Sequence, residues 1–250
     1  DELIAARETP PELRDRLATM LEIRDFASQE LGLPNNGSYR SYADLDRPYV
    51  VWSVFAAPEF SLTPQTWCFP FVGCVAYRGY FSEERARDYA QGLAADGLDV
   101  YVAGIAAYST LGRFSDPVLN TMLVSGDSYL AGLIFHELSH QQLYIEDDSA
   151  FNEGFASLVE EEGVRRWLIS RGDETAWTDW LERRERRRQF NNLVAASIGE
   201  LRALYASELT PDSMRAEKKV ITGAMREAHA RLREQWGGTA SYEAWFRGPM

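Results

Sequence analysis

Two histidines and a glutamate stand close together in the stretch His136-Glu137-Leu138-Ser139-His140. On a helix, residues four apart project from one face, so both imidazoles can reach the same metal ion. Glu137 is rotated by roughly 100° from His136 and can stand beside a metal-activated water without ligating the metal. Zinc lowers the pKa of such a water to about 7, and the carboxylate takes its proton during attack on a carbonyl. The stretch therefore predicts a hydrolytic zinc site, with His136 and His140 as ligands and Glu137 as general base.

The residues around this stretch favour a metal site over a chance occurrence of the same spacing. The chain has only three histidines, and two of them fall here. The helix is apolar nearly all round, so two imidazoles and a carboxylate within it need a compensating partner. Its apolar residues are Leu130, Leu133, Ile134, Phe135 and Leu138. The same pattern also occurs in helices without metal, so a third ligand decides the interpretation.

Glu153 is the predicted third ligand, because catalytic zinc usually has three protein ligands and a water. Twelve residues, 141–152, separate it from His140. Gln141 to Glu146 can finish the first helix, and 147–150 can form the turn of a helical hairpin. Asp147 and Asp148 are rival ligands. Asp148 is better explained as a helix cap or as a partner of a ligand histidine.

The segment Asn152-Glu153-Gly154-Phe155-Ala156 resembles the third-ligand motif of the gluzincin metallopeptidases, although the connection from His140 is shorter here. A wider likeness, from about Asp25 to Leu168, is to the bacterial putative aminopeptidase family. The blocks that carry it are Tyr77–Phe81, Tyr108–Gly112, Phe135–Tyr144 and Asp148–Val159. The resemblance implies a zincin-like fold, zinc as cofactor, a peptide substrate and aminopeptidase activity. An endopeptidase using the same site and a zinc-binding scaffold without turnover are the alternatives.

A donor for the oxyanion is expected besides the metal. Tyr108, Tyr205 and His229 are candidates, and the sequence does not select among them; gluzincins take this donor from their second lobe. His229 looks like an exposed helical residue. Resemblance to gluzincins also implies that the strand Asp99–Tyr108 is a sheet edge that pairs with extended substrate, while an interior strand is the alternative.

Glu160 and Glu161 are candidates to hold the α-ammonium of a substrate, or they simply face water. The chain carries 38 acidic and 26 basic residues, for a formal charge of −12. That balance argues against a nucleic-acid partner, which needs clustered Lys and Arg.

The two cysteines and the first residue of the chain indicate in which cellular compartment the protein is expected. Pro70 and Gly73 favour a turn that brings Cys68 and Cys74 together, so we expect a disulfide and an oxidising compartment; two buried thiols are the alternative. No stretch reaches the roughly 20 apolar residues of a membrane span. The chain begins at Asp1, which we take as a removed N-terminus. The family resemblance then implies a periplasmic or cell-envelope protein, attached to the membrane through a removed N-terminal lipid anchor.

The elements expected to position these residues change character along the chain. Up to residue 124 the pattern is mixed: a helix from Thr9 to Gly32, strands at Tyr49–Ala57, Val72–Phe81 and Asp99–Tyr108, and a helix at Ser82–Ala95. Beyond it the pattern is helical. These helices are Asp116–Val124, a motif helix starting at Ser125–Ser128, one from Asp148 or Ser149 to Ser170, and segments Glu174–Leu209 and Pro211–Trp236. We predict an α+β fold: one catalytic domain, 1–250, with an N-terminal mixed-sheet lobe (1–124) and the active-site helices and helical lobe (125–250).

Overall fold

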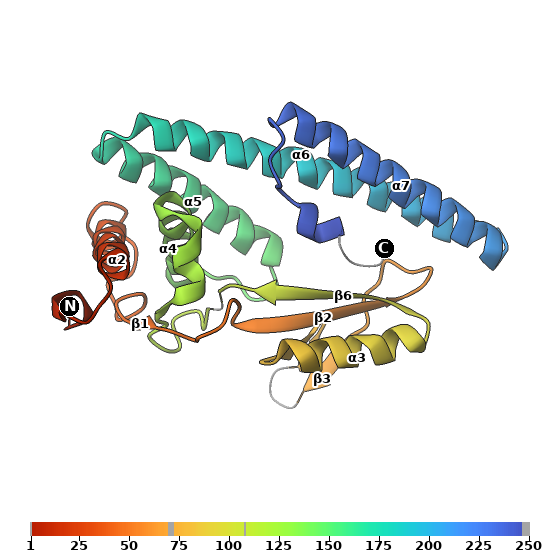
Figure 1. Ribbon diagram of the computed structural model, residues 1–250, viewed down its shortest axis with the longest axis horizontal. Helices are drawn as coiled ribbons and strands as arrows, with labels where there is room; N and C mark the ends of the chain where they lie inside the picture. The colour runs from red at the N-terminus through yellow and green to blue at the C-terminus, as the bar shows by residue number, and fades with distance from the viewer. Residues whose placement is uncertain (1, 70–72, 108, 247–250) are drawn as a thin grey trace. The chain divides into compact units, whose positions relative to one another are not determined.

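The protein is α+β, as predicted. A computed structural model describes residues 2–69, 73–107 and 109–246 (Figure 1). The chain divides into two compact units. Unit 1 comprises Asp1–Val50 and Ala106–Leu181, and unit 2 comprises Val51–Ile105 and Glu182–Met250. The expected lobe boundary after residue 124 falls inside unit 1, because the chain enters unit 2 and returns before the motif helix. None of the described helices has both the length and the apolar composition to cross a bilayer.

Unit 1 is built mainly from helices. Its elements are α1 (Glu2–Ala5), α2 (Pro11–Gln29), β1 (Tyr42–Ala43), β7 (Val118–Leu119), the 3-10 helix η1 (Asn120–Ser125), α4 (Asp127–Gln142), α5 (Ser149–Ser170) and the beginning of α6 (Glu174–Tyr205). The two short strands pair in parallel. Strand β7 and η1 occupy the stretch for which the sequence predicted a short helix, since β1 offers Val118 and Leu119 a pairing partner that local pattern does not show.

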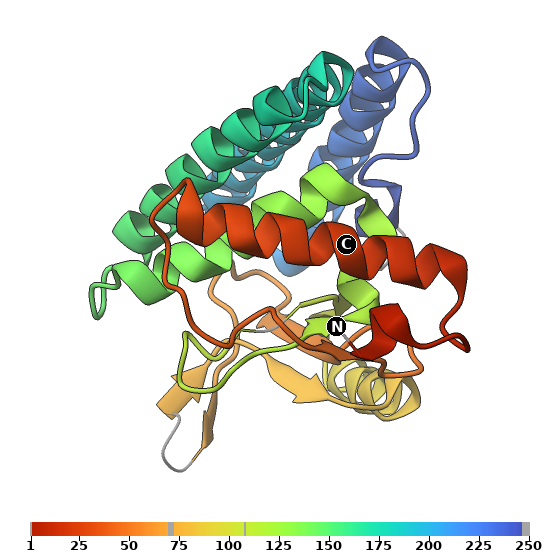
Figure 2. The same cartoon turned by 90° about the vertical axis from the view of Figure 1, so that its left-hand side faces the viewer.

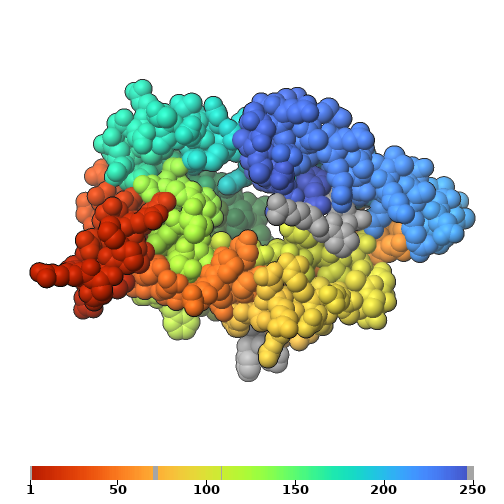
Figure 3. Space-filling view, viewed as in Figure 1, coloured from red at the N-terminus to blue at the C-terminus, as the bar shows by residue number. Residues whose placement is uncertain are grey.

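The core of unit 1 is centred on α4. Figure 2 shows α2 lying across it, and three residues of α4, Ile134, Phe135 and Leu138, are fully buried. On another side α5 approaches closely, because Gly163 has no side chain. A Cβ at that position would lie 2.6 Å from a ring carbon of Phe135. Figure 3 shows that part of α4, in light green, reaches the surface beside the red N-terminal segment.

Arg24 fixes the loop that follows α2. Its side chain is completely buried and donates hydrogen bonds to the carbonyl oxygens of Ser38 at 2.8 Å, Pro34 at 2.7 Å and Asn36 at 3.1 Å. The guanidinium also donates to Ser28 Oγ at 2.5 Å. Burial, helped by the charge of Arg40, lowers the pKa of Arg24 to about 10, so the group stays charged at neutral pH. One buried cation therefore satisfies three carbonyls of loop 34–38.

Unit 2 contains a three-stranded sheet. Its elements are β2 (Val51–Pro58), β3 (Trp67–Phe69), β4 (Gly73–Val75), β5 (Arg78–Tyr80), α3 (Glu83–Ala95), β6 (Leu98–Ile105), the remainder of α6, α7 (Pro211–Gln235) and η2 (Glu243–Phe246). The strand order is β5-β2-β6, and both neighbours run antiparallel to β2. The expected mixed sheet is therefore wrong for this sheet: β2 lies between the two strands that α3 connects. Among the described residues β6 pairs only with β2, so it is an edge strand.

The predicted disulfide is present. Cys68 and Cys74 are directly opposite each other in the small hairpin formed by β3 and β4 and are joined by a disulfide. Residues 70–72, between the two strands in the sequence, lie outside the described residues. A disulfide of this kind closes a short loop and restricts the unfolded chain.

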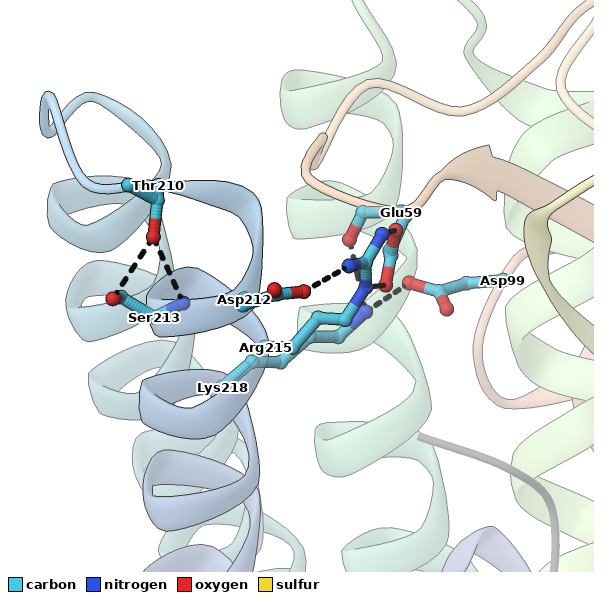
Figure 4. A network of polar contacts seen from close by, with 7 residues as sticks. All are labelled: Glu59, Asp99, Thr210, Asp212, Ser213, Arg215 and Lys218. Carbon is cyan, nitrogen blue, oxygen red and sulfur yellow. Dashed lines mark hydrogen bonds and ion pairs between the residues drawn. The ribbon is translucent and has the colours of Figure 1, made fainter.

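Four charged side chains fasten α7 within unit 2 (Figure 4). Arg215 binds the carboxylate of Glu59 through two nitrogens, at 2.7 and 2.9 Å. Lys218 donates to the carbonyl oxygen of Glu59 at 2.9 Å and pairs with Asp99 at the start of β6. These contacts tie α7 to the loop after β2 and to the edge strand.

Candidate metal centre

The helix α4 carries the predicted ligand pair. It begins at Asp127, whose carboxylate lies at the positive end of the helix dipole, and ends at Gln142 before the extended residue Leu143. His136 and His140 lie on one face, with their ring centroids 4.9 Å apart. His140 is 6% exposed and His136 18% exposed. The spacing of the motif and the helix therefore bring both imidazoles to the same place.

A tight turn brings α5 back against α4. Asp148 caps α5 by accepting a hydrogen bond from the Phe151 N–H at 3.0 Å, as the sequence predicted for it. The side chain of Asn152 accepts from the Ile145 N–H at 2.8 Å and donates to the Ile145 carbonyl at 2.7 Å. The buried Asn152 amide thus bridges the turn just before Glu153.

The hairpin places Glu153 opposite the two histidines. Its carboxylate oxygens lie 3.4 Å from His136 Nε2 and 3.6 Å from His140 Nε2. One ligand atom from each of the three residues lies within 4.8 Å of the others. Two atoms that each lie about 2.0–2.1 Å from a tetrahedral metal ion are about 3.4 Å apart. The donor set and its spacing therefore fit a single tetrahedral cation.

Glu160 contacts the ring nitrogen of His136 that does not face Glu153. Its carboxylate lies 3.2 Å from His136 Nδ1, so the Nε2 atom of the same ring remains directed to Glu153. Gly132 makes room for this contact, because a Cβ there would lie 3.2 Å from both Cγ and Oε1 of Glu160. A carboxylate on the outer nitrogen of a ligand histidine fixes its tautomer and its orientation.

The electrostatics of His136 are dominated by acidic neighbours. Burial lowers its pKa, but the hydrogen bond that its Nδ1 donates to Glu160 and the charges of Glu137, Glu160 and Glu153 outweigh burial, and the net pKa is raised. A concentration of negative charge around an imidazole also attracts a divalent cation. The second histidine differs: His140 Nδ1 is buried and has no hydrogen-bond partner among the described residues.

Glu137 lies beside the ligand pair without joining it. It is half-buried on α4, and its charge acts on the imidazole of His136. No hydrogen bond to its carboxylate is found within the described part of the chain. It is not among the three residues whose ligand atoms converge. A carboxylate in this position is available to take a proton from water.

Of the other predicted residues, one lies outside the described residues and two belong to unit 2. Tyr108 lies outside the described residues. Tyr205 belongs to unit 2, where its ring packs edge-on against Phe60 and burial raises its pKa, partly offset by Lys218. His229 is not exposed, as the sequence suggested, but 5% exposed among aromatic rings, with Nε2 at 2.9 Å from the Ser241 carbonyl. His229 packs against the ring of Phe190. The charged residues beside His229 in the sequence do not indicate this contact.

The sequence predicted a different role for Glu160 and no role for Tyr39. Glu160 was a candidate for binding substrate ammonium, whereas its carboxylate is engaged with His136. A signal for this existed, because Glu160 follows Glu153 by two helical turns and shares its face. Tyr39 is buried, and burial together with the charge of Glu137 raises its pKa; more than ninety residues separate the two, so no local signal relates them.

Two helices that present two imidazoles and a carboxylate at one point define a candidate metal centre. The model of the family described as "putative aminopeptidase" matches residues 1–250, so the chain belongs to that family. The family description points to hydrolysis of peptides. No curated protein and no solved structure matches the chain.

Proposed function

We propose that this protein is a zinc-dependent aminopeptidase. The observation that carries the proposal is the convergence of His136, His140 and Glu153 within 4.8 Å, with Glu137 beside them. The family description supports peptide bonds as the substrate class. Two neutral imidazoles and one carboxylate form a ligand set of catalytic zinc sites, which leave one position open.

Each side chain has a separate task in the proposed reaction. Nε2 of His136, Nε2 of His140 and the carboxylate of Glu153 would hold the ion. Bound zinc supplies Lewis acidity, which polarises a carbonyl and makes water a nucleophile at neutral pH. Glu137 accepts the proton of the attacking water and passes it to the departing amine. Glu153 is 64% exposed, which leaves the site open to water and substrate.

The disulfide supports a location for this activity. Disulfides form and persist in oxidising compartments, such as the bacterial periplasm, and are rare in the cytosol. The Cys68–Cys74 bridge is therefore consistent with the proposed periplasmic or cell-envelope location. Attachment through an N-terminal lipid anchor belongs to the same proposal.

Matched peptides test the activity. Purified protein is expected to contain about one zinc per chain and to release the first residue of peptides with a free α-amino group. The same peptides, acetylated at the N-terminus, are expected to remain intact. Mass spectrometry of the products reads both. Internal cleavage of blocked peptides would replace the exopeptidase by an endopeptidase, and a zinc-loaded protein inactive on broad peptide libraries would favour the scaffold.

Changing Glu160 tests how the metal is held. Glu160→Gln keeps the size of the side chain but weakens the hydrogen bond that orients His136, so zinc affinity is expected to fall by about 10- to 100-fold. Competition with a chromophoric chelator measures the affinity. Glu162→Gln, two residues along α5, is the control, since Glu162 pairs with Arg165 and Arg166. Equal affinities for the two variants would remove Glu160 from the site.

A further inference from the structure

The connection between α4 and α5 exposes apolar side chains to water. Three consecutive residues, Leu143, Tyr144 and Ile145, are 40%, 53% and 42% exposed. Phe151, on the first turn of α5 and next to the Asn152 that binds Ile145, is 42% exposed as well. Apolar side chains exposed singly are ordinary, whereas neighbouring ones gathered at one place indicate a binding surface.

Tyr144 joins these apolar residues to the candidate metal centre. Its ring lies edge-on to the ring of His140, with centroids 6.3 Å apart and planes inclined at 74°. Aromatic rings at this separation and inclination are in favourable contact. Because Tyr144 is also more than half exposed, one part of its ring touches a predicted ligand and another part faces water. An apolar contact surface therefore begins directly beside the ligand set.

Hydrogen bonds on both sides of Tyr144 fix its backbone. The Leu143 N–H donates to the Ser139 carbonyl at 3.0 Å, on the last turns of α4. Asn152 of α5 binds both the N–H and the carbonyl of Ile145. The hairpin that carries the ligands thus also carries this tyrosine. A surface that is in place before its ligand arrives loses less affinity to ordering.

We propose that Tyr144, with Leu143 and Ile145, forms a subsite that selects an apolar side chain on a residue flanking the bond that is cut. The inference rests on the proposed function and narrows its substrate class. Consecutive Cα atoms are about 3.8 Å apart, so a flanking residue lies beside the ligand set, within reach of a ring that contacts His140. Burying an apolar side chain against that ring removes both from water.

The same turn disfavours an acidic side chain. Glu146, Asp147 and Asp148 follow the apolar residues directly, and all three are exposed. A carboxylate on the flanking residue would gain nothing from the ring and would be repelled by these charges. The expected order of preference is therefore leucine, then glycine, then aspartate.

Peptides that differ only at the first or second residue test this order. We expect kcat/KM to be at least about 10-fold higher with leucine than with glycine at one of the two positions, and lowest with aspartate. In Tyr144→Ser the ratio of leucine to glycine is expected to fall to within about threefold. Tyr144→Phe retains the ring and is expected to retain the ratio. Unselective cleavage by the wild type, an unchanged ratio in Tyr144→Ser, or a ratio lost in Tyr144→Phe overturns the subsite.

Ile169→Ser is the matched control. Ile169 is 58% exposed on α5 and lies about 24 Å along that helix from Glu153. The substitution also removes an exposed apolar side chain from the ligand-bearing hairpin, but far from the ligands. Its ratio of leucine to glycine is expected to equal that of the wild type. A ratio that falls equally in Ile169→Ser and Tyr144→Ser would overturn the assignment to Tyr144.

Binding without turnover separates the subsite from the peptidase reaction. Leucine hydroxamate and glycine hydroxamate share a zinc-binding group and differ only in the side chain. Calorimetric titration of zinc-loaded protein is expected to give leucine hydroxamate a Kd about 10-fold lower, and Tyr144→Ser is expected to remove the difference. Equal affinities in the wild type overturn the subsite. A Tyr144-dependent difference in a protein that cleaves no peptide would instead reject the peptidase and retain the subsite.

Discussion

Glu137→Gln is expected to lower kcat for peptide hydrolysis by about 10²- to 10⁴-fold, the range for loss of a general base. Glutamine has nearly the same shape but cannot accept the proton of the attacking water. Glu137 is not among the converging ligands, so zinc content is expected to remain that of the wild type. Steady-state kinetics on a free-N-terminus peptide, with elemental analysis of the same sample, measures both quantities.

The control for this variant is Glu30→Gln. Glu30 is exposed at the end of α2, and the substitution makes the same chemical change away from the ligands. Its kcat is expected to match the wild type. Loss of zinc together with activity in Glu137→Gln would instead make Glu137 part of the metal-binding set, and retained activity would remove it as the base.

Arg24→Ala is expected to destabilise the protein by about 3–5 kcal/mol, as the sum of a cavity and unsatisfied buried carbonyls. The guanidinium satisfies the carbonyls of Ser38, Pro34 and Asn36 at once. Arg24→Lys keeps the charge but offers a single nitrogen, so we expect an intermediate loss of about 1–3 kcal/mol. Denaturant unfolding of the metal-free protein gives these free energies.

Arg40→Ala is the comparison for Arg24. Its guanidinium pairs with Asp25 at 2.8 Å, but both side chains are partly exposed to water. Its removal is expected to cost no more than about 1 kcal/mol. If the two alanine variants unfold alike, Arg24 does not organise loop 34–38.

Local signals predicted the helices well. Asp148 caps α5 as predicted, and α3 and α7 begin within one residue of their expected starts at Ser82 and Pro211. The ligand hairpin was predictable for the same reason, because the helical repeat fixes which side chains share a face. Its bounds were not: α4 ends at Gln142 and not at Glu146, so the connection is 143–148 and not 147–150. Sequence neighbours determine these features, so one sequence is enough to read them.

Features formed by distant segments were not predictable in this way. The insertion of β2 between β5 and β6 depends on pairing across the chain, which local pattern does not encode. The attachment of loop 34–38 depends on Arg24 before it and on Gln141 far after it. The burial of His229 depends on rings brought from other segments.

Asn152 has a consequence for how related sites should be recognised. Its amide closes a ring with Ile145, so the register between His140 and Glu153 is set by one side chain and not by the number of intervening residues alone. An insertion inside that ring would break both hydrogen bonds, whereas substitutions at its exposed positions would leave them intact. Asparagine directly before the acidic ligand is thus a better criterion for finding such hairpins in other chains than a fixed interval after the second histidine.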